Sequence, residues 1–414
     1  MLTVDDALAR VLEATHPLPP IACGLHQALG SRLAEDIRAD EDAPPFDKAL
    51  VDGYAVCSDC WQSGAATVRL RVIEHVPAGR VPSQRVLPGT ASFVMTGAPL
   101  PPGADAMVMR EYAELDGDDV LLSPPKPPTG GTHWMPRGRE LTAGAVVAGA
   151  SSRIDAVLQG VLASVGASRP VVYPRPRVTI LSTGDELVSP EVKPGPGQIR
   201  NSNSVLLEGL VRQANADPTL LETAPDDPEI LTNRLLEGLD PHQADLLLIS
   251  GGVSAGTHDL VPGLLEDLGV QPIFHKIRMK PGKPLFFGLK LGVVPDRPIL
   301  VFGLPGNPVS VLVGFINFVL PCLNRLGGAP DQPSQHPQGV LTSPFVHRGD
   351  RPTYFPCRIE HDPAGVRRVF PLAWNGSSDL VTLSKASALA VFPAGDRNYA
   401  SGETISIVMI PGRN

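Results

Sequence analysis

The sequence predicts a multidomain protein of the α/β plus β class, and three features of the chain lead to this expectation. From Arg177 onward, strand-like and helix-like segments alternate, as in a parallel sheet covered by helices on both faces. Between Gly53 and Leu141, and again between Gly339 and Ile410, short β-branched runs are separated by turn residues, as in β domains. The 414 residues also exceed what one hydrophobic core usually supports, so we expect two to four domains.

The α/β part carries the clearest local signals. Thr3 and Asp6 form the pattern of a capping box, which predicts a helix that continues through Leu12. The further expected helices are Ser202 to Ala214, Pro228 to Leu239 and Val309 to Leu323. Apolar runs typical of buried strands are Val178 to Leu181, Thr219 to Glu222, Asp245 to Ile249, Pro272 to Met279 and Pro298 to Phe302.

The β-rich segments divide the chain into the remaining domains. Strand-like runs in the first of them are Val68 to Val76, Ala91 to Met95, Ala106 to Met109 and Val120 to Leu122. A Gly- and Pro-rich linker precedes the second, which ends in the strand-like run Thr404 to Met409. The predicted domains are a discontinuous linking domain (21–45 and 143–174), an inserted β-rich domain (46–142), an α/β domain (1–18 and 175–326) and a C-terminal small β-barrel-like domain (331–414).

Three turns rich in glycine and proline follow three of the strand-like runs. They are Ser250 to Ser254, Lys280 to Pro284 and Gly303 to Pro308. Open α/β sheets bind their ligands at the carboxyl ends of the strands, where such turns lie. Glycine lets backbone N–H groups approach a ligand, and lysine adds a compact positive charge, so the expected ligand is a phosphate or another oxyanion. One such turn alone would be ordinary turn chemistry, but three in one domain favour a binding site.

Composition excludes several classes of function. The net charge is −8 and no run of lysine or arginine occurs, which argues against a nucleic-acid partner or an anionic membrane surface. The longest apolar segment, Val309 to Leu323, contains Asn317 and Pro321 and is short for a bilayer span. Because the N-terminus also lacks the pattern of a signal peptide, we expect a cytoplasmic enzyme. The five scattered cysteines do not form a disulfide framework.

Seven segments match, in order, the motifs of one known family. They are Pro44 to Asp47 with Val51 to Ala55, Met95 to Pro99, Ser182 to Leu187, Gly197 to Asn203, and the three turns named above. The chain therefore resembles the molybdopterin molybdenumtransferases, the MoeA family, which includes the gephyrin E domain. The resemblance implies an elongated, L-shaped homodimer with a molybdopterin-binding α/β domain and an active site at the dimer contact. It also implies an enzyme that converts adenylylated molybdopterin and molybdate into molybdenum cofactor and AMP.

Molybdate is a tetrahedral dianion, so its site needs fixed cations and neutral hydrogen-bond donors. A helix N-terminus favours anions, which supports Ser310, although a plain capping role is the alternative for this serine. By resemblance, the groups on the molybdate side are Lys283, Pro284, Ser310 and Ser377. The groups expected to bind the rest of the substrate are Lys280 with Gly251, Gly252 and Ser254.

The substrate carries a pyrophosphate and a phosphate-bearing pterin. Because carboxylates repel these negative groups, their presence near the site needs an explanation. A Mg²⁺ ion between carboxylates and phosphate oxygens is the simplest one, with Glu186, Asp226 and Asp259 as its expected ligands. The alternatives for these acids are hydrogen bonds to the pterin, a base for water, or, at Asp226, a helix cap. The resemblance also marks Asp52 and Thr96 of the inserted domain as functional.

One departure from the family pattern concerns molybdate directly. The family often has an arginine two residues after a phenylalanine, and here Cys357 occupies that position after Phe355. If this segment is a strand, the next residue, Arg358, points to the opposite face. Arg351 is the expected substitute if its loop folds back toward the site.

Two other classes of function stay open. A gephyrin-like scaffold would keep the fold and dimer without a working site, but Lys280, Lys283 and Asp52 are all present. A molybdopterin adenylyltransferase would typically show Gly-Gly-Thr-Gly where this chain has Gly251 to Ser254. For the preferred enzyme, the expected partners are adenylylated molybdopterin, molybdate and a second copy of the chain, with the adenylyltransferase and recipient molybdoenzymes as further candidates.

Overall fold

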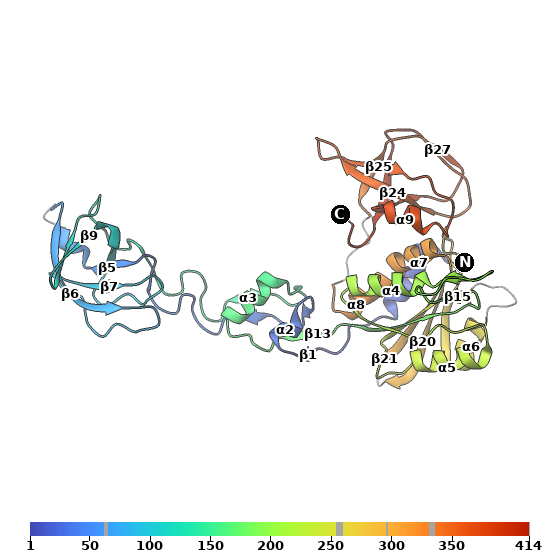
Figure 1. Cartoon of the computed structure of the whole chain (residues 1–414), viewed down its shortest axis with the longest axis horizontal. Helices are drawn as coiled ribbons and strands as arrows, with labels where there is room; N and C mark the ends of the chain where they lie inside the picture. The colour runs from blue at the N-terminus through green and yellow to red at the C-terminus, as the bar shows by residue number, and fades with distance from the viewer. Residues whose placement is uncertain (62–64, 254–259, 295–296, 331–335, 414) are drawn as a thin grey trace. The chain divides into compact units, whose positions relative to one another are not determined.

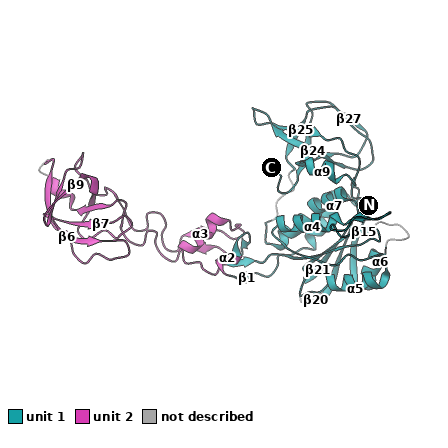
Figure 2. Cartoon of the chain, viewed as in Figure 1, with its two compact units in different colours: residues 1–23, 28–34, 171–414 teal, residues 24–27, 35–170 magenta. Residues whose placement is uncertain are grey.

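A computed structural model describes residues 1–61, 65–253, 260–294, 297–330 and 336–413. The chain forms two compact units, which Figure 2 colours separately. Unit 1 consists of Met1–Cys23, Ala28–Ala34 and Val171–Asn414, and unit 2 consists of Gly24–Gln27 and Glu35–Pro170. Two of the predicted site residues, Ser254 and Asp259, lie outside the described residues.

A six-stranded sheet forms the centre of unit 1 (Figure 1). Its order is β17 (Asp217–Leu220), β14 (Arg177–Ser182), β18 (Leu246–Ser250), β21 (Arg297–Leu304), β20 (Phe286–Val294) and β19 (Val270–His275). The first four strands are parallel, as expected, whereas β20 runs antiparallel to both of its neighbours. The reason is the length of the connections on either side of β20, which are too short for the crossover that a parallel pair requires.

Helices cover both faces of this sheet, as the alternating pattern predicted (Figure 1). One face packs against α1 (Val4–Glu13), α4 (Ser202–Gln213) and a continuous helical segment made of α7 (Pro308–Gly314), the π-helical η3 (Phe315–Val319) and α8 (Leu320–Leu326). The other face packs against α5 (Pro228–Gly238) and α6 (Val261–Asp267). Thr3 caps α1 by accepting a hydrogen bond from the backbone N–H of Asp6, as expected.

The segment Pro308–Leu326 is also the one described helix long and apolar enough to cross a membrane. Its 19 residues have a mean hydropathy of 1.7, but 78% of the most apolar stretch is buried inside the protein. Phe315 and Phe318 are fully buried in the core beneath the sheet. The apolar composition of this segment is thus accounted for by core packing.

The register of the sheet places the predicted turns at one edge. Ser182, Ser250 and Leu304 are aligned across β14, β18 and β21 at the carboxyl ends of the strands. Phe286, at the start of β20, pairs with His275 and Gly303, so the connection from β19 to β20 opens at the same edge. The expectation that the three turns meet at the rim of one sheet is therefore confirmed.

The C-terminal part of unit 1 is a closed five-stranded barrel. Its strands are β22 (Gln338–Leu341), β25 (Arg367–Pro371), β24 (Thr353–His361), β26 (Ala388–Phe392) and β28 (Thr404–Met409), with β23 (Phe345–His347), β27 (Arg397–Tyr399) and α9 (Leu380–Lys385) beside it. A bridge between Lys280 and Thr353 joins it to the α/β part. Barrel residues such as Tyr354 and Leu389 also belong to the core under the sheet, so the two parts share apolar packing.

Smaller elements complete unit 1. The strand β13 (Val171–Tyr173) lies between β1 (Ile21–Ala22) and β2 (Arg32–Leu33). The strands β15 (Leu187–Val188) and β16 (Ile199–Arg200) form a two-stranded arm at the base of an exposed loop. Helix α2 (Leu25–Ala28) spans the division between the two units.

Unit 2 is built around a second six-stranded sheet. Its order is β8 (Ala106–Met109), β5 (Gly53–Val56), β7 (Thr90–Val94), β6 (Val68–Val76), β10 (Asp119–Leu122) and β9 (Ala113–Asp116). The other elements are β3 (Ile37–Arg38), β12 (Val146–Ala148), β4 (Lys48–Ala49), β11 (Trp134–Met135), η1 (Ser58–Trp61), η2 (Arg110–Tyr112) and α3 (Ala156–Ser164). The four strand-like runs predicted for the inserted segment all form strands, with ends within one residue of the expectation.

Candidate functional site

Two adjoining cavities open at the carboxyl-terminal edge of the sheet in unit 1. The first, here called the glycine-turn pocket, has a volume of about 660 Å³ and is lined by Thr183, Gly184, Glu186, Asn203, Asp226, Ser250, Gly251, Gly252 and Gly306, among others. The second, the lysine pocket, has a volume of about 710 Å³ and is lined by Lys280, Lys283, Ser310, Arg348, Arg351, Trp374 and Ser377, among others. Pro284, Pro305 and Asn307 line both, so the pockets share a wall.

The turn after β18 requires glycine for a physical reason. Gly251 has a φ of +99°, which side chains other than hydrogen rarely tolerate. A Cβ atom at Gly251 would also lie 2.3 Å from the carbonyl oxygen of Thr183, well inside van der Waals contact. The turn can therefore pack closely against the strand end at Thr183, and Gly251 and Gly252 line the glycine-turn pocket.

Glu186 and Asp226, two of the three predicted metal ligands, line the glycine-turn pocket together. The Glu186 carboxylate lies over Gly184, where a Cβ would come within 2.4 Å of Oε2. Asp226 accepts a hydrogen bond of 3.0 Å from the hydroxyl of Thr183. The cap of α5 is the neighbouring Asp227, which accepts from two backbone N–H groups, so the capping alternative for Asp226 is wrong.

Two carboxylates on one pocket suit a Mg²⁺ ion, because this ion usually takes one or two protein carboxylates and completes its shell with water and phosphate oxygens. No group of three acidic, histidine or cysteine side chains among the described residues is close enough to hold a metal alone. Asp259, the third predicted ligand, falls in the part of the chain that is not described. Glu186 and Asp226 thus fit the ion as a partial ligand set that substrate phosphates would complete.

The lysine pocket presents positive charge that no described acidic side chain neutralises at the two lysines. Lys280 and Lys283 are both exposed, and within the described ranges neither ammonium forms an ion pair. Their backbone is fixed, because Lys280 pairs with the barrel segment Pro352 to Tyr354 and the Lys283 carbonyl accepts from Ile277. Two ammonium groups on a rigid turn are well suited to an oxyanion.

Two predicted serines lie in the same pocket. Ser310 is buried in the first turn of α7, and Asn307 rather than Ser310 occupies the N-cap position. The plain capping alternative for Ser310 is therefore wrong. Ser377 comes from the barrel part, where its carbonyl accepts a hydrogen bond of 3.0 Å from the backbone N–H of Val309. This bond holds the barrel loop against the start of the helix, and both serines line one cavity.

Three residues bear on the arginine that the family pattern leads one to expect near Cys357. Cys357 is buried in the barrel wall, where burial raises the pKa of its thiol to about 12 despite a hydrogen bond to the backbone. Arg358 points away, as the strand alternation predicted, and pairs with Glu360 at 3.0 Å. Arg351 does line the lysine pocket, so its loop folds back as the substitute role requires.

Arg351 and Arg348 both line this pocket, but they differ in how many guanidinium N–H groups remain available to a ligand. The Arg348 guanidinium donates to the carbonyls of His347 and Arg397 and to the side chain of Asn398. Arg351 donates to the Met279 carbonyl at 3.2 Å and lies 3.6 Å from the Asp350 carboxylate. A guanidinium carries five N–H groups, so Arg351 keeps more of them for a ligand.

Asp52 and Thr96, the predicted pair from the inserted domain, lie in unit 2 and contact each other. The Asp52 carboxylate accepts hydrogen bonds of 2.7 Å from both the backbone N–H and the hydroxyl of Thr96. These bonds, the backbone one first, lower the pKa of Asp52, and the charge of Arg110 adds to the effect. Asp52 is therefore held ionised in a fixed orientation.

Sequence reasoning missed two polar groups that the structure places in these pockets. Asn203 lines the glycine-turn pocket and Trp374 lines the lysine pocket, and both carry a buried side-chain atom without a hydrogen-bond partner. Asn203 lies within a matched motif, but an amide has no charge or spacing signal that would single it out. Trp374 lies three residues before the predicted Ser377, and this proximity is the one hint that the sequence offers.

Comparisons with known proteins agree with this architecture. Residues 2–166 match the model of the MoeA N-terminal region, 179–325 that of a probable molybdopterin-binding domain, and 338–410 that of the MoeA C-terminal region. A molybdopterin molybdenumtransferase of Nostoc is 34% identical over 94% of this chain and 88% of its own. That of Bacillus subtilis is 32% identical over 100% of this chain and 95% of its own.

A solved structure shows the same fold over the full length. The molybdopterin biosynthesis MoeA protein of Pyrococcus horikoshii superposes with a TM-score of 0.80 at 28% identity, covering 100% of both chains. With three family models in order and full-length relatives above 30% identity, the chain belongs to the MoeA family of molybdopterin molybdenumtransferases, which are enzymes.

Proposed function

We propose that this protein inserts molybdate into adenylylated molybdopterin, releasing AMP and forming the molybdenum cofactor. The observation that carries the proposal is the pair of adjoining pockets with opposite chemistry. One offers glycine turns and two carboxylates, and the other offers two exposed lysines and two serines. A substrate with a phosphate-rich body and a metal-accepting dithiolene needs both environments side by side.

In the lysine pocket, Lys283, Ser310 and Ser377 bind the molybdate oxygens. The two hydroxyls donate hydrogen bonds, and the ammonium supplies charge on a turn whose backbone is fixed by the Ile277 pair. Such preorganised donors need no rearrangement when the ion arrives. Lys280 reaches the same space and neutralises phosphate oxygens of the substrate.

In the glycine-turn pocket, Gly251 and Gly252 allow the phosphates to lie close to the backbone. Glu186 and Asp226 hold a Mg²⁺ ion, which neutralises charge on the pyrophosphate when bound. The Thr183 hydroxyl donates to Asp226 and so fixes the orientation of that carboxylate. The shared wall of Pro284, Pro305 and Asn307 keeps the metal-accepting end of the substrate beside the oxyanion.

The central test is an insertion assay with purified protein, adenylylated molybdopterin, molybdate and Mg²⁺. Release of AMP and activation of an apo-molybdoenzyme are expected for the parent. Lys283→Ala should lower the initial insertion rate about 100-fold or more at low molybdate, because it removes a charged contact to the ion. Retention of the parental rate by this variant would refute the oxyanion site.

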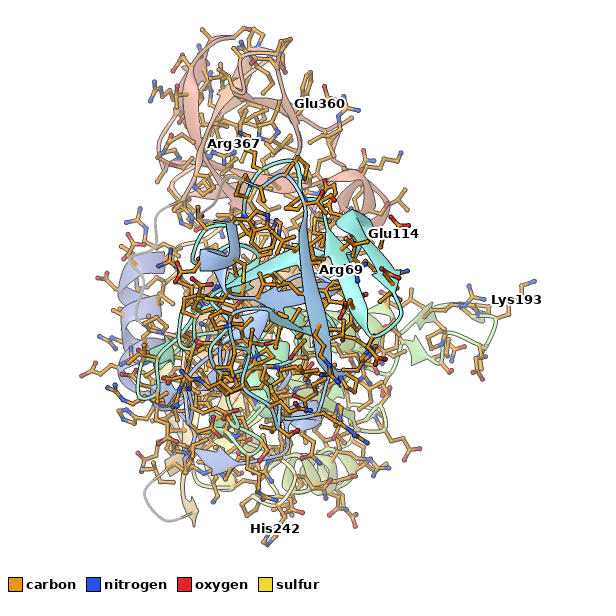
Figure 3. The ribbon with its side chains drawn as sticks, turned by 90° about the vertical axis from the view of Figure 1, so that its left-hand side faces the viewer. Arg69, Glu114, Lys193, His242, Glu360 and Arg367 are labelled. Atoms are coloured by element: carbon orange, nitrogen blue, oxygen red, sulfur yellow. The ribbon has the colours of Figure 1, made fainter. Side chains whose placement is uncertain are left out.

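A matched control variant is available in the same unit. Lys193 is exposed on the loop between β15 and β16 and projects from the body of the protein (Figure 3). Lys193 lines neither pocket, so Lys193→Ala removes the same charge outside both linings and should keep the parental rate. Equal losses for Lys193→Ala and Lys283→Ala would show that net charge, rather than the pocket, controls activity.

The proposal extends to assembly and cellular context. We propose a cytoplasmic homodimer with the active site at the dimer contact, to which Asp52 and Thr96 are supplied by the partner protomer. The family resemblance supports this arrangement, and the ionised, oriented Asp52 is suited to such a role. The adenylyltransferase that makes the substrate and the molybdoenzymes that receive the product are the proposed protein partners.

A further inference from the structure

The side chain of Asn203 joins two of the pocket-forming turns. Its Nδ2 donates to the Ser250 hydroxyl at 2.8 Å and to the Gly306 carbonyl at 2.7 Å. Asn203 itself belongs to the first turn of α4, so three elements meet at this amide. The Gly306 carbonyl can only accept a hydrogen bond, which fixes the amide orientation and places Nδ2 toward the turns.

This orientation leaves the other end of the amide without a partner. Asn203 Oδ1 is buried and accepts no hydrogen bond from the described residues. Buried carbonyl oxygens nearly always have a donor, and leaving one unsatisfied destabilises the protein. Asn203 lines the glycine-turn pocket, so a ligand in this pocket is the natural source of the missing N–H.

The other polar groups of this pocket narrow the chemical class of that donor. Phosphate oxygens carry no hydrogen and cannot satisfy a carbonyl oxygen. The candidate donors are therefore the O–H groups of the ribose and the N–H groups of the heterocycles, and we develop the heterocycle alternative because it can be tested with matched pairs of rings. Both heterocycles of the proposed substrate qualify, since the pterin and the adenine each carry an amino group beside a ring nitrogen.

We propose that Asn203 is a specificity residue that accepts a hydrogen bond from the amino group of the bound heterocycle. The inference rests on the proposed function, because that function supplies the heterocycle. Asn203 then acts twice: Nδ2 positions the two turns, and Oδ1 distinguishes an amino-bearing ring from one without it. One hydrogen bond of this kind changes affinity about tenfold.

The test measures binding alone, by calorimetry on the full-length protein without molybdate. The probes are pterin against 4-hydroxypteridine, which lacks the amino group, and AMP against purine riboside monophosphate, which lacks it likewise. The parent should prefer the amino-bearing member of one pair about tenfold. Asn203→Ala should abolish that preference, and the affinity for inorganic pyrophosphate measures separately how much is lost with the Nδ2 contacts to the two turns.

The outcomes separate the alternatives. A lost preference in the pterin pair assigns the contact to the pterin, and a lost preference in the AMP pair assigns it to the adenine. No preference in the parent, which needs no variant to fold, overturns the inference. So does an equal loss for all probes and pyrophosphate, because that result would mean Asn203 only positions the turns. A failed insertion assay would leave these binding results standing, so the two proposals fail separately.

Discussion

At the scale of single residues, Asp245 shows how the sheet is held at the end opposite the pockets. Its buried carboxylate accepts hydrogen bonds from Arg177 at 2.8 Å and from Arg297 at 2.6 Å. Burial alone would raise the pKa of Asp245, but the hydrogen bonds from the Arg177 side chain and backbone, with the charges of Arg177 and Arg297, outweigh burial and lower it. The ionised form is thus favoured in the folded protein.

This depressed pKa predicts an acid-sensitive fold. The contribution of Asp245 to stability is present above the ordinary aspartate pKa of about 3.9 and is lost as the pH falls through the lower folded value. Asp245→Asn should destabilise the protein at pH 7 by about 2 kcal/mol, less than for a fully buried pair because both arginines stay partly exposed. Urea unfolding at pH 7 and pH 3 measures both effects. A variant whose loss of stability persists undiminished at pH 3 would contradict the assignment.

Arg351 carries the second prediction at this scale. If its free N–H groups bind molybdate, Arg351→Ala should raise the molybdate concentration for half-maximal insertion about tenfold or more, with little change in the rate at saturation. The matched control is Arg358→Ala, which removes an arginine from the same barrel that pairs with Glu360 instead. An unchanged requirement in Arg351→Ala, or the same rise in both variants, would exclude Arg351 as the substitute.

Which site residues the sequence could predict depends on the kind of signal each one carries. Lys280, Lys283 and Gly251 follow strand-like runs, so periodicity alone located them at the sheet edge. Asn203 was missed because its role depends on contacts with Ser250 and Gly306, which are distant in the chain. Whether a buried polar atom lacks a hydrogen-bond partner depends on three-dimensional packing, so the sequence pattern cannot reveal it.

At the scale of elements, the turn after β18 sets a sharp requirement for glycine. Gly251→Ala should cost about 3 kcal/mol, because it combines a left-handed backbone with overlap against the Thr183 carbonyl. Gly197→Ala is the control, since Gly197 has a φ of +79° but open space around its Cβ position. It should cost about 1 kcal/mol. Thermal unfolding compares the two, and equal costs would show that the Thr183 contact is not limiting.

Helices and strands whose apolar pattern is continuous in the sequence are the easiest to predict. The run Val309 to Leu323 lies inside the observed helical segment Pro308–Leu326, whereas the strand Phe286–Val294 was not expected. Gly288 and Gly292 interrupt that run, and glycine is depleted in strands. The linear pattern therefore does not indicate the antiparallel hairpin that completes the sheet. Only the observed pairing of β20 with both β19 and β21 shows where this strand lies in the sheet.

At the scale of the whole molecule, the homodimer proposal makes a quantitative prediction. Asp52→Asn and Lys283→Ala should each be inactive, because each removes one half of every shared site. Co-expressing the two variants should restore about a quarter of the parental activity, since half of the dimers are mixed and each mixed dimer has one intact site of two. Each variant co-expressed with itself is the control. Activity no higher in the mixture than in the controls would contradict a site shared between protomers.

The Arg177, Asp245 and Arg297 cluster has a consequence for how this protein can change. It lies where β14 and β21 begin and just before β18, while the proposed binding site lies where these strands end. Mutations at the pocket edge of the sheet therefore leave this ionic cluster, and its contribution to stability, unchanged. Natural evolution or laboratory selection could therefore change the residues at the pockets to bind another oxometalate without destabilising the fold.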